Sequence, residues 1–238
     1  MNPSRSALSP EALRAALVGA RLYGILDLGY ADATRLVEIA RRLIADGEGV
    51  QMLQLRAKDH PPEQIARWAE SLLPLARAAG VPLVVNDHVE VAAEVGADGV
   101  HLGQDDGPLD AARGRLRPGA LVGRSTHSLE QALQAAVEGA DYIGFGPLHA
   151  TPTKPGRPAI GLDGIAEVQR RVDLPVFCIG GLTSGQLPDL RRRGLQRAVI
   201  VSALLQAPDI AAEARRARAA LELIPKEREH DPEMENGG

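Results

Sequence analysis

The chain has 238 residues, of which 45% are hydrophobic and 24% are charged, and its formal net charge is −4. A negative balance gives no general attraction to nucleic acid or to an anionic membrane surface, and an aromatic content of 3% leaves few rings for stacking bases. No apolar stretch approaches the roughly 20 residues of a membrane-spanning helix. We therefore expect a soluble protein that acts on small molecules, with neither nucleic acid nor membrane as a partner.

Cys178 is the single cysteine, and it lies in the apolar run 175–179. One thiol cannot form an internal disulfide, which predicts a reducing, cytoplasmic location. Nothing around Cys178 in the sequence activates a thiolate, so we interpret it as a buried structural residue.

Short apolar runs alternate with longer amphipathic segments along the chain. The runs are continuously apolar, as expected for strands buried on both faces of a parallel sheet; they cover 22–27, 50–55, 82–86, 99–102, 121–124, 141–145, 175–179 and 198–201. Helical patterns lie between them at 34–45, 63–79 and 128–138, the last opened by Ser128 as a candidate N-cap. Glycines follow several helices where a left-handed turn is expected, at Gly47, Gly80, Gly96, Gly139 and Gly194.

Eight strand–helix units predict a single α/β domain, a (β/α)8 TIM barrel, over residues 22–224. A helical extension precedes it at 1–21, and a polar, disordered tail follows at 225–238. A doubly wound open sheet is the alternative, but no Gly-rich turn follows the first strand. A homo-oligomer is compatible with this sequence.

Polar side chains gather where the predicted strands end, the position of active sites in such barrels. Arg56 and Lys58 are two residues apart after the second strand, so on an extended segment both would face one site and suit a diphosphate or carboxylate. The alternative is a solvent-facing basic pair. Asp87 and Asp106 follow the third and fourth strands, and two carboxylates beside substrate phosphate oxygens suit Mg²⁺. Either aspartate could instead cap the next helix.

The last two strands run into Gly180-Gly181 and Val201-Ser202, the latter followed by a short helix candidate at 203–205. Loops after strands seven and eight of a barrel often bind a phosphate through backbone N–H groups. The polar loop 151–156 could close over such a ligand, with Thr hydroxyls and Lys154 on the phosphate. Plain connecting loops are the alternative. His101 and His127 are equally compatible with structural and catalytic roles.

These residues resemble the motifs of the thiamine-phosphate synthase family. The resemblance runs in order through about 22–210 and is carried by Gln54-Leu55-Arg56-x-Lys58, Asn86-Asp87, the segment 98–106 with His101 and Asp106, Gly123-x-Ser125-x-His127, Gly146-Pro147, Thr151-x-Thr153-Lys154 and Ile179-Gly180-Gly181. The first strand departs from the family pattern because it lacks a Thr-Asp pair near its end.

The resemblance implies a transferase that joins 4-amino-5-hydroxymethyl-2-methylpyrimidine diphosphate to a hydroxyethylthiazole phosphate, releasing pyrophosphate with Mg²⁺ as cofactor. It implies that Asp87 and Asp106 hold the metal. The resemblance implies that the pyrimidine diphosphate is bound by Tyr23, Gln54, Arg56, Lys58, Asn86, Ser125 and Lys154. Of these, it implies that Ser125, Lys154 and Arg56 are catalytic. It implies that the thiazole phosphate is bound by Thr151, Thr153, Gly181, Val201 and Ser202.

Two alternative functions are also compatible with the sequence. The related thiazole tautomerase shares a stretch like 125–128 but does not need the metal and diphosphate residues. A non-catalytic barrel that binds a phosphate ligand would need pockets and no metal. The joint presence of Arg56, Lys58, Asn86, Asp87, Asp106 and Lys154 favours the synthase.

Overall fold

The computed structural model describes residues 7–149 and 159–222 and contains a closed parallel barrel in the strand order β1 to β8. The strands are β1 (Leu22–Asp27), β2 (Met52–Arg56), β3 (Leu83–Asn86), β4 (Gly99–Leu102), β5 (Leu121–Thr126), β6 (Tyr142–Phe145), β7 (Val176–Cys178) and β8 (Arg197–Ile200). Strand β8 pairs with β1, with Leu22 opposite Ala198, so the barrel prediction is confirmed and the open sheet is wrong.

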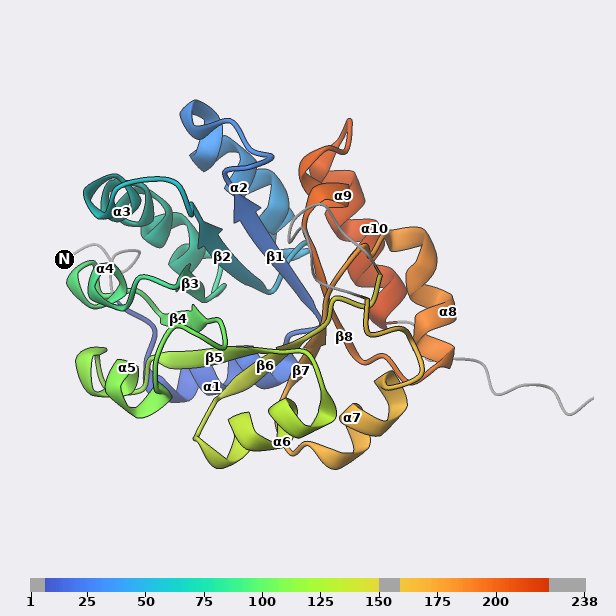
Figure 1. Cartoon of the computed structure of the whole chain (residues 1–238). Helices are drawn as coiled ribbons and strands as arrows, with labels where there is room; N and C mark the ends of the chain where they lie inside the picture. Colours follow the sequence, from blue (N-terminus) through green and yellow to red (C-terminus); the bar gives the residue numbers. More distant parts are fainter. Residues whose placement is uncertain (1–6, 150–158, 223–238) are drawn as a thin grey trace, which may run out of the picture.

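Helices surround the barrel (Figure 1). They are α1 (Pro10–Gly19), α2 (Leu36–Ile44), α3 (Pro62–Ala78), α4 (Val89–Glu94), α5 (Leu109–Arg115), α6 (Leu129–Val137), α7 (Ile165–Arg171), α8 (Leu187–Arg192), α9 (Ser202–Leu205) and α10 (Ile210–Glu222), with 3-10 turns at Ala33–Arg35, Ala45–Gly47 and Ser184–Gln186. The buried apolar residues of helices α2 to α10 form one cluster with residues of the strands. In the part of the chain that the structure describes, none of the helices has the length and apolarity needed to cross a membrane.

The local signals in the sequence have the expected geometry. The Ser128 hydroxyl accepts from the Gln131 N–H at 3.1 Å and begins α6. All the predicted helix-ending glycines have positive φ, from 62° at Gly96 to 98° at Gly194. Strand β5 continues two residues beyond its predicted end, to Thr126, because its pairing with β6 extends to the Thr126–Phe145 position. Ser125 therefore lies within a strand rather than in a loop.

The first helix closes the N-terminal end of the barrel. Leu13 and Leu17 of α1 are buried in one cluster with the inward-facing Tyr23, Tyr142 and Phe177. Arg197, at the start of β8, donates to the carbonyl oxygens of Val18 and Ala20. Figure 1 shows α1 on the far side of the barrel from the viewer. The bottom of the core is thus formed by the segment that precedes β1.

Two equivalent carboxylates anchor strands at this same end. The tripeptide Gly-Ala-Asp ends at Asp98 before β4 and at Asp141 before β6. Asp98 accepts from the Leu83 N–H and pairs with Arg77 and Arg117. Asp141 accepts from the Val122 N–H and pairs with Arg14 and Arg113 in the same manner.

Cys178 is the last residue of β7 and is fully buried. Burial raises the pKa of its thiol to about 12. A thiol that is neutral and inaccessible at physiological pH is a poor nucleophile, which confirms its structural interpretation.

Candidate active site

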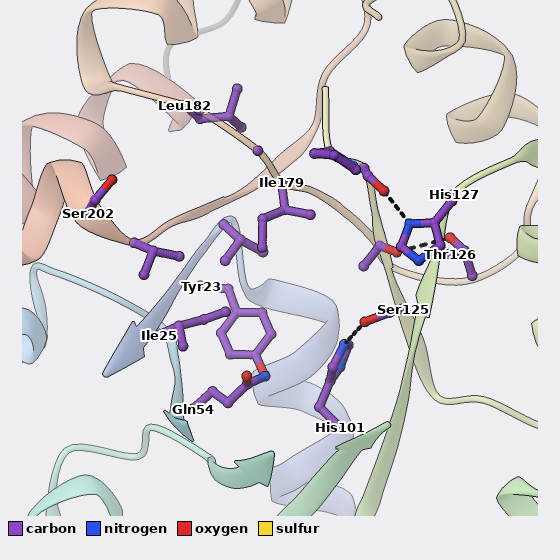
Figure 2. Close-up of a pocket in the computed structure, with 17 residues that line it drawn as sticks. Tyr23, Ile25, Gln54, His101, Ser125, Thr126, His127, Ile179, Leu182 and Ser202 are labelled. Carbon is purple, nitrogen blue, oxygen red and sulfur yellow. Dashed lines mark hydrogen bonds between the residues drawn. The ribbon is translucent and has the colours of Figure 1, made fainter. Parts of the chain in front are cut away.

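A pocket opens inside the barrel at the C-terminal ends of the strands, and it brings together residues from distant parts of the sequence (Figure 2). Six of the predicted substrate-binding residues line it: Tyr23, Gln54, Ser125, Gly181, Val201 and Ser202. Strand residues two apart face the same side of a sheet, so Tyr23 and Ile25 both point into the barrel from β1. The remaining lining is mostly apolar, as is common in small-molecule sites.

His101 and His127 also line this pocket, although the sequence left their roles open. His101 points inward from β4, and its Nε2 lies 3.0 Å from the Ser125 Oγ. His127 Nδ1 lies 2.5 Å from the Gly146 carbonyl oxygen and ties the end of β5 to the end of β6. The available sequence signal for His101 was the alternation of β4, which makes every second side chain face the interior.

A cluster of charged side chains lies beside the pocket. Asp87 follows β3, and the side chains of Asn86, Asp106 and Lys58 are near enough to affect the pKa of its carboxyl group. The Asp87 N–H donates to the His101 carbonyl oxygen at 2.9 Å, so one strand residue connects the pocket with the acidic cluster. Asp87 has a φ of 62°, a left-handed conformation uncommon outside glycine and found disproportionately at functional sites.

The Asp106 carboxylate opposes the ionisation of Asp87. Burial, followed by the hydrogen bond and the charge of Asp106, raises the pKa of Asp87 to about 6, while the Lys58 ammonium acts in the opposite direction. Neither aspartate caps a helix: the N-cap of α4 is His88 and that of α5 is Pro108. The capping alternative for Asp87 and Asp106 is therefore wrong.

Asp106 lies on a short loop that is fixed from two sides. Its Oδ2 accepts from the Gly103 N–H at 2.6 Å. The buried Arg124 of β5 donates from Nη1 to the Gly103 carbonyl oxygen at 2.5 Å and from Nη2 to that of Gly107 at 2.8 Å. The loop after β4 is thus held by the neighbouring strand, a contact that the sequence did not reveal.

Arg56 and Lys58 differ from the expectation that both extend from one strand. Strand β2 ends at Arg56, and Lys58 lies on the following exposed turn. The Arg56 Nη1 donates to the buried Asp27 carboxylate at 2.6 Å. Lys58 is close enough to Asp87 to lower the pKa of that carboxyl group. Of the two cations, Arg56 therefore belongs to the strand and Lys58 to the turn that follows it.

Three of the five predicted thiazole-phosphate residues, Gly181, Val201 and Ser202, line the opposite side of the pocket, where β7 and β8 end. Gly180 and Gly181 have φ values of 112° and 65°, and a Cβ on Gly180 would come within 2.6 Å of Pro147. Helix α9 begins at Ser202, which confirms the short helix predicted there. Thr151, Thr153 and Lys154 lie outside the described residues.

The donor set fits Mg²⁺. Hard cations prefer carboxylate oxygens, and Mg²⁺ commonly takes one or two of them together with substrate phosphates and waters. Burial and the nearby Asp106 raise the pKa of Asp87, and a cation bound between the two side chains would favour the charged form of Asp87. Among residues 7–149 and 159–222 no group of three or more His, Cys, Asp or Glu side chains is placed to bind a metal, so the remaining ligands would come from substrate and water.

Comparison with known proteins defines the class. The family model described as thiamine monophosphate synthase matches residues 22–204. A thiamine-phosphate synthase of Chloroflexus aurantiacus is 43% identical over 204 residues, covering 85% of this chain and 93% of its own. That of Thermus thermophilus is 47% identical over 174 residues, covering 73% and 84%.

The structural comparison agrees. The solved thiamine phosphate pyrophosphorylase of Pyrococcus furiosus superposes with a TM-score of 0.77 at 32% identity, over 88% of this chain and 98% of its own. A 3-hexulose-6-phosphate synthase, 19% identical with a TM-score of 0.60, shares the fold. The closed barrel, with a pocket at the C-terminal ends of its strands, thus defines a protein of the TIM-barrel class. The chain belongs to the thiamine monophosphate synthase family and is a transferase of thiamine biosynthesis, which confirms the resemblance found in its motifs.

Proposed function

We propose that the protein joins 4-amino-5-hydroxymethyl-2-methylpyrimidine diphosphate to 4-methyl-5-(2-hydroxyethyl)thiazole phosphate or its carboxylated form, giving thiamine phosphate and pyrophosphate. One observation carries this proposal: a largely apolar pocket and the cluster of Asp87, Asp106 and Lys58 lie at the same end of the barrel, where the Asp87 N–H donates to the backbone carbonyl oxygen of the pocket residue His101. The pocket suits an aromatic ring, and the cluster suits a diphosphate with its metal.

The diphosphate group would lie over Arg56, Lys58 and Asn86, with Lys154 joining from the loop after β6. Asp87 and Asp106 would hold Mg²⁺, which neutralises charge that develops on the leaving pyrophosphate. Arg56 is directed by Asp27 and keeps further guanidinium donors for phosphate oxygens. These residues together would stabilise the departing pyrophosphate. The methylene carbon of the pyrimidine, from which the pyrophosphate departs, would then become electrophilic.

Ser125 would donate a hydrogen bond to the leaving group, and Tyr23 and Gln54 would contact the pyrimidine. Bond breaking would be driven by leaving-group stabilisation and by positioning rather than by a protein nucleophile.

The thiazole phosphate would bind where β7 and β8 end, through backbone N–H groups near Gly181 and Val201 and the hydroxyls of Ser202, Thr151 and Thr153. The thiazole nitrogen would then face the pyrimidine methylene across the pocket. This arrangement places the two phosphate-bearing ends at opposite sides of the barrel mouth and the two rings between them. We further propose a cytoplasmic location, consistent with the buried, unpaired thiol of Cys178.

The decisive experiment supplies both purified substrates, with and without Mg²⁺, and measures thiamine phosphate and pyrophosphate. Equal amounts of the two products, formed only with Mg²⁺, support the synthase. The tautomerase alternative is tested by incubating the carboxylated thiazole phosphate alone and following its isomerisation. Isomerisation without coupling would overturn the proposal, and ligand binding without either reaction would favour the non-catalytic barrel.

A further inference from the structure

A continuous chain of hydrogen bonds crosses the barrel interior from Gln54 to Ser125. Gln54 Nε2 donates to the Tyr23 hydroxyl at 2.7 Å, and that hydroxyl lies 3.1 Å from the hydroxyl of Tyr142. The Tyr142 hydroxyl lies 3.2 Å from Nδ1 of His101, whose Nε2 lies 3.0 Å from the Ser125 Oγ. Figure 2 shows Tyr23 beside Gln54 and His101 directed at Ser125.

The donation from Gln54 Nε2 indicates the direction of this chain, because in that direction both phenol protons have a partner. Each phenol has one proton to donate, and the Tyr23 oxygen already accepts from Gln54. The Tyr23 proton then goes to the Tyr142 oxygen, and the Tyr142 proton goes to His101 Nδ1. A neutral His101 with Nδ1 as acceptor carries its own proton on Nε2 and donates it to Ser125.

The surroundings keep both phenols protonated and close to their partners. Tyr23 and Tyr142 are buried, and burial raises the pKa of each, so both hold their protons at neutral pH. Phe177 packs edge-on against both rings, with centroids 5.4 Å and 5.8 Å away. In this apolar setting a phenol without a partner would be costly, so the fully paired arrangement is favoured.

Gly123 makes room for the central contact of the chain. A Cβ at this position would come within 2.2 Å of Tyr142 Cζ and 2.6 Å of His101 Nδ1. Any side chain there would therefore separate the phenol from the imidazole. The glycine is explained by neither backbone conformation nor a turn, because it lies inside β5.

We propose that Tyr142 is a positioning residue that holds His101 in its neutral Nε2–H form, which directs the Ser125 hydroxyl proton toward the leaving group. At the other end, Gln54 uses its amide N–H on Tyr23 and so presents its carbonyl oxygen to the pocket. That oxygen is an acceptor suited to the exocyclic amine of an aminopyrimidine. The assignment of these two ends to substrate groups rests on the proposed function, whereas the His101 tautomer does not.

The proposal separates two interpretations of the His101–Ser125 pair. A serine within 3.0 Å of an imidazole could be a nucleophile with its general base. A base would need an unprotonated Nε2, and the chain from Gln54 places the proton there. If the chain ran in reverse, His101 would carry its proton on Nδ1, and Gln54 would present its NH₂ to the pocket.

The tautomer can be measured directly in the substrate-free, full-length protein by ¹⁵N NMR of the histidine rings near neutral pH. The His101 signals are assigned by their loss in His101→Gln. We expect a protonated Nε2 and an unprotonated Nδ1 for His101 in the wild type. A protonated Nδ1, on a neutral or a charged ring, would overturn the proposal whatever the enzyme's activity.

Tyr142→Phe removes the central hydroxyl and keeps the ring, with Phe177→Leu as a control that loosens the same aromatic cluster without removing a polar atom. We expect Tyr142→Phe to abolish the single-tautomer pattern and to lower kcat about tenfold, with KM for the thiazole phosphate unchanged. Phe177→Leu should keep the Nε2–H pattern. An unchanged His101 tautomer in folded Tyr142→Phe, or the same loss in Phe177→Leu, would contradict the positioning role.

If wild-type coupling is absent while the Nε2–H form is present, the proposed function fails and the hydrogen-bond chain stands. If coupling is present with the opposite tautomer, the chain fails and the function stands. A 4-oxo analogue of the pyrimidine diphosphate checks the far end: we expect it to be a poor substrate, and a preference for it over the 4-amino compound would contradict the orientation of Gln54.

Discussion

Arg56 and Asp27 form an ion pair across directly paired strand positions, with Nη1 2.6 Å from Oδ2, at the rim of the candidate diphosphate site. Asp27 also accepts from the Gly29 N–H at 3.0 Å, so one carboxylate shapes the loop after β1 and directs the guanidinium. The first strand, which departs from its family's pattern, thereby still contributes to the site.

Asp27→Asn should lower kcat/KM for the pyrimidine diphosphate about tenfold or more, because Arg56 loses the charge that orients it. Asparagine keeps an oxygen for the Gly29 N–H, so the loop should survive and the free energy of unfolding should fall by roughly 1–3 kcal/mol. Steady-state kinetics and urea unfolding measure the two effects. Unaltered kinetics in the folded variant would show that Asp27 does not position Arg56.

Asp87→Asn and Asp106→Asn should each reduce coupling by at least about a hundredfold and weaken Mg²⁺ binding, because each removes one of the two carboxylates proposed to hold the metal. Asparagine is chosen because it tolerates the positive φ of Asp87. Asp105→Asn provides the matched control, with the same charge change on an exposed neighbour. Titration of Mg²⁺ by calorimetry and by activity should separate the variants from this control.

Stability should depend on pH through Asp87. Its pKa is about 6 in the folded protein and near 3.8 in an unfolded chain, so the folded state binds the proton more tightly. This contribution to stability is present below about pH 4 and is lost as the pH rises through 6. Without metal, urea unfolding of wild type should therefore lose stability relative to Asp87→Asn across that window.

Mg²⁺ should reverse this loss at pH 7.5, with about 2.7 kcal/mol of added stability at a concentration one hundred times its Kd. The same addition at pH 5 should stabilise less, because the metal must displace a proton. Asp87→Asn should respond weakly at both pH values. A stability difference that does not vary with pH would contradict the raised pKa of Asp87.

Arg124→Met should weaken Mg²⁺ binding about tenfold without contacting the metal, since Arg124 fixes the loop that carries Asp106. Arg113→Met is a suitable comparison, because Arg113 also donates to a loop carbonyl, that of Gly139, but at the N-terminal end of the barrel. Both variants should lose stability, and only Arg124→Met should lose metal affinity. Calorimetry with Mg²⁺ alone decides between them.

Cys178→Ala should retain coupling activity, because the thiol is fully buried in β7 and its pKa is raised to about 12. The native enzyme should react with a thiol reagent only after unfolding. Rapid labelling of the folded protein, or loss of turnover in the alanine variant, would contradict a purely structural role.

Much of the fold could be predicted because its signals are local. The apolar runs, the cap at Ser128 and the glycines after the helices depend on neighbouring residues, and so does the grouping of polar residues at strand ends. The end of β2 was less certain, since Lys58 was expected to extend from the strand and instead lies on a turn.

The contacts that organise the site could not be predicted from the sequence, because they depend on which strands become neighbours when the barrel closes. Arg56 meets Asp27 through the register of two strands, and Tyr23 meets Tyr142 across 119 residues. Arg124 reaches back to the loop after β4 only because β5 lies beside it. Residue types indicated a phosphate and metal site, whereas the partners of each side chain required the three-dimensional arrangement.

The paired anchors at Asp98 and Asp141 lie at the end of the barrel away from the pocket, each joining two strands and two arginines. Changes that reinforce those anchors would raise heat tolerance while leaving the catalytic rim untouched. Conversely, new substrate preferences could evolve by rewriting the loops at the rim while the anchored base preserves the fold. The residues that stabilise the base of the barrel are thus separate from the residues that form the rim of the pocket.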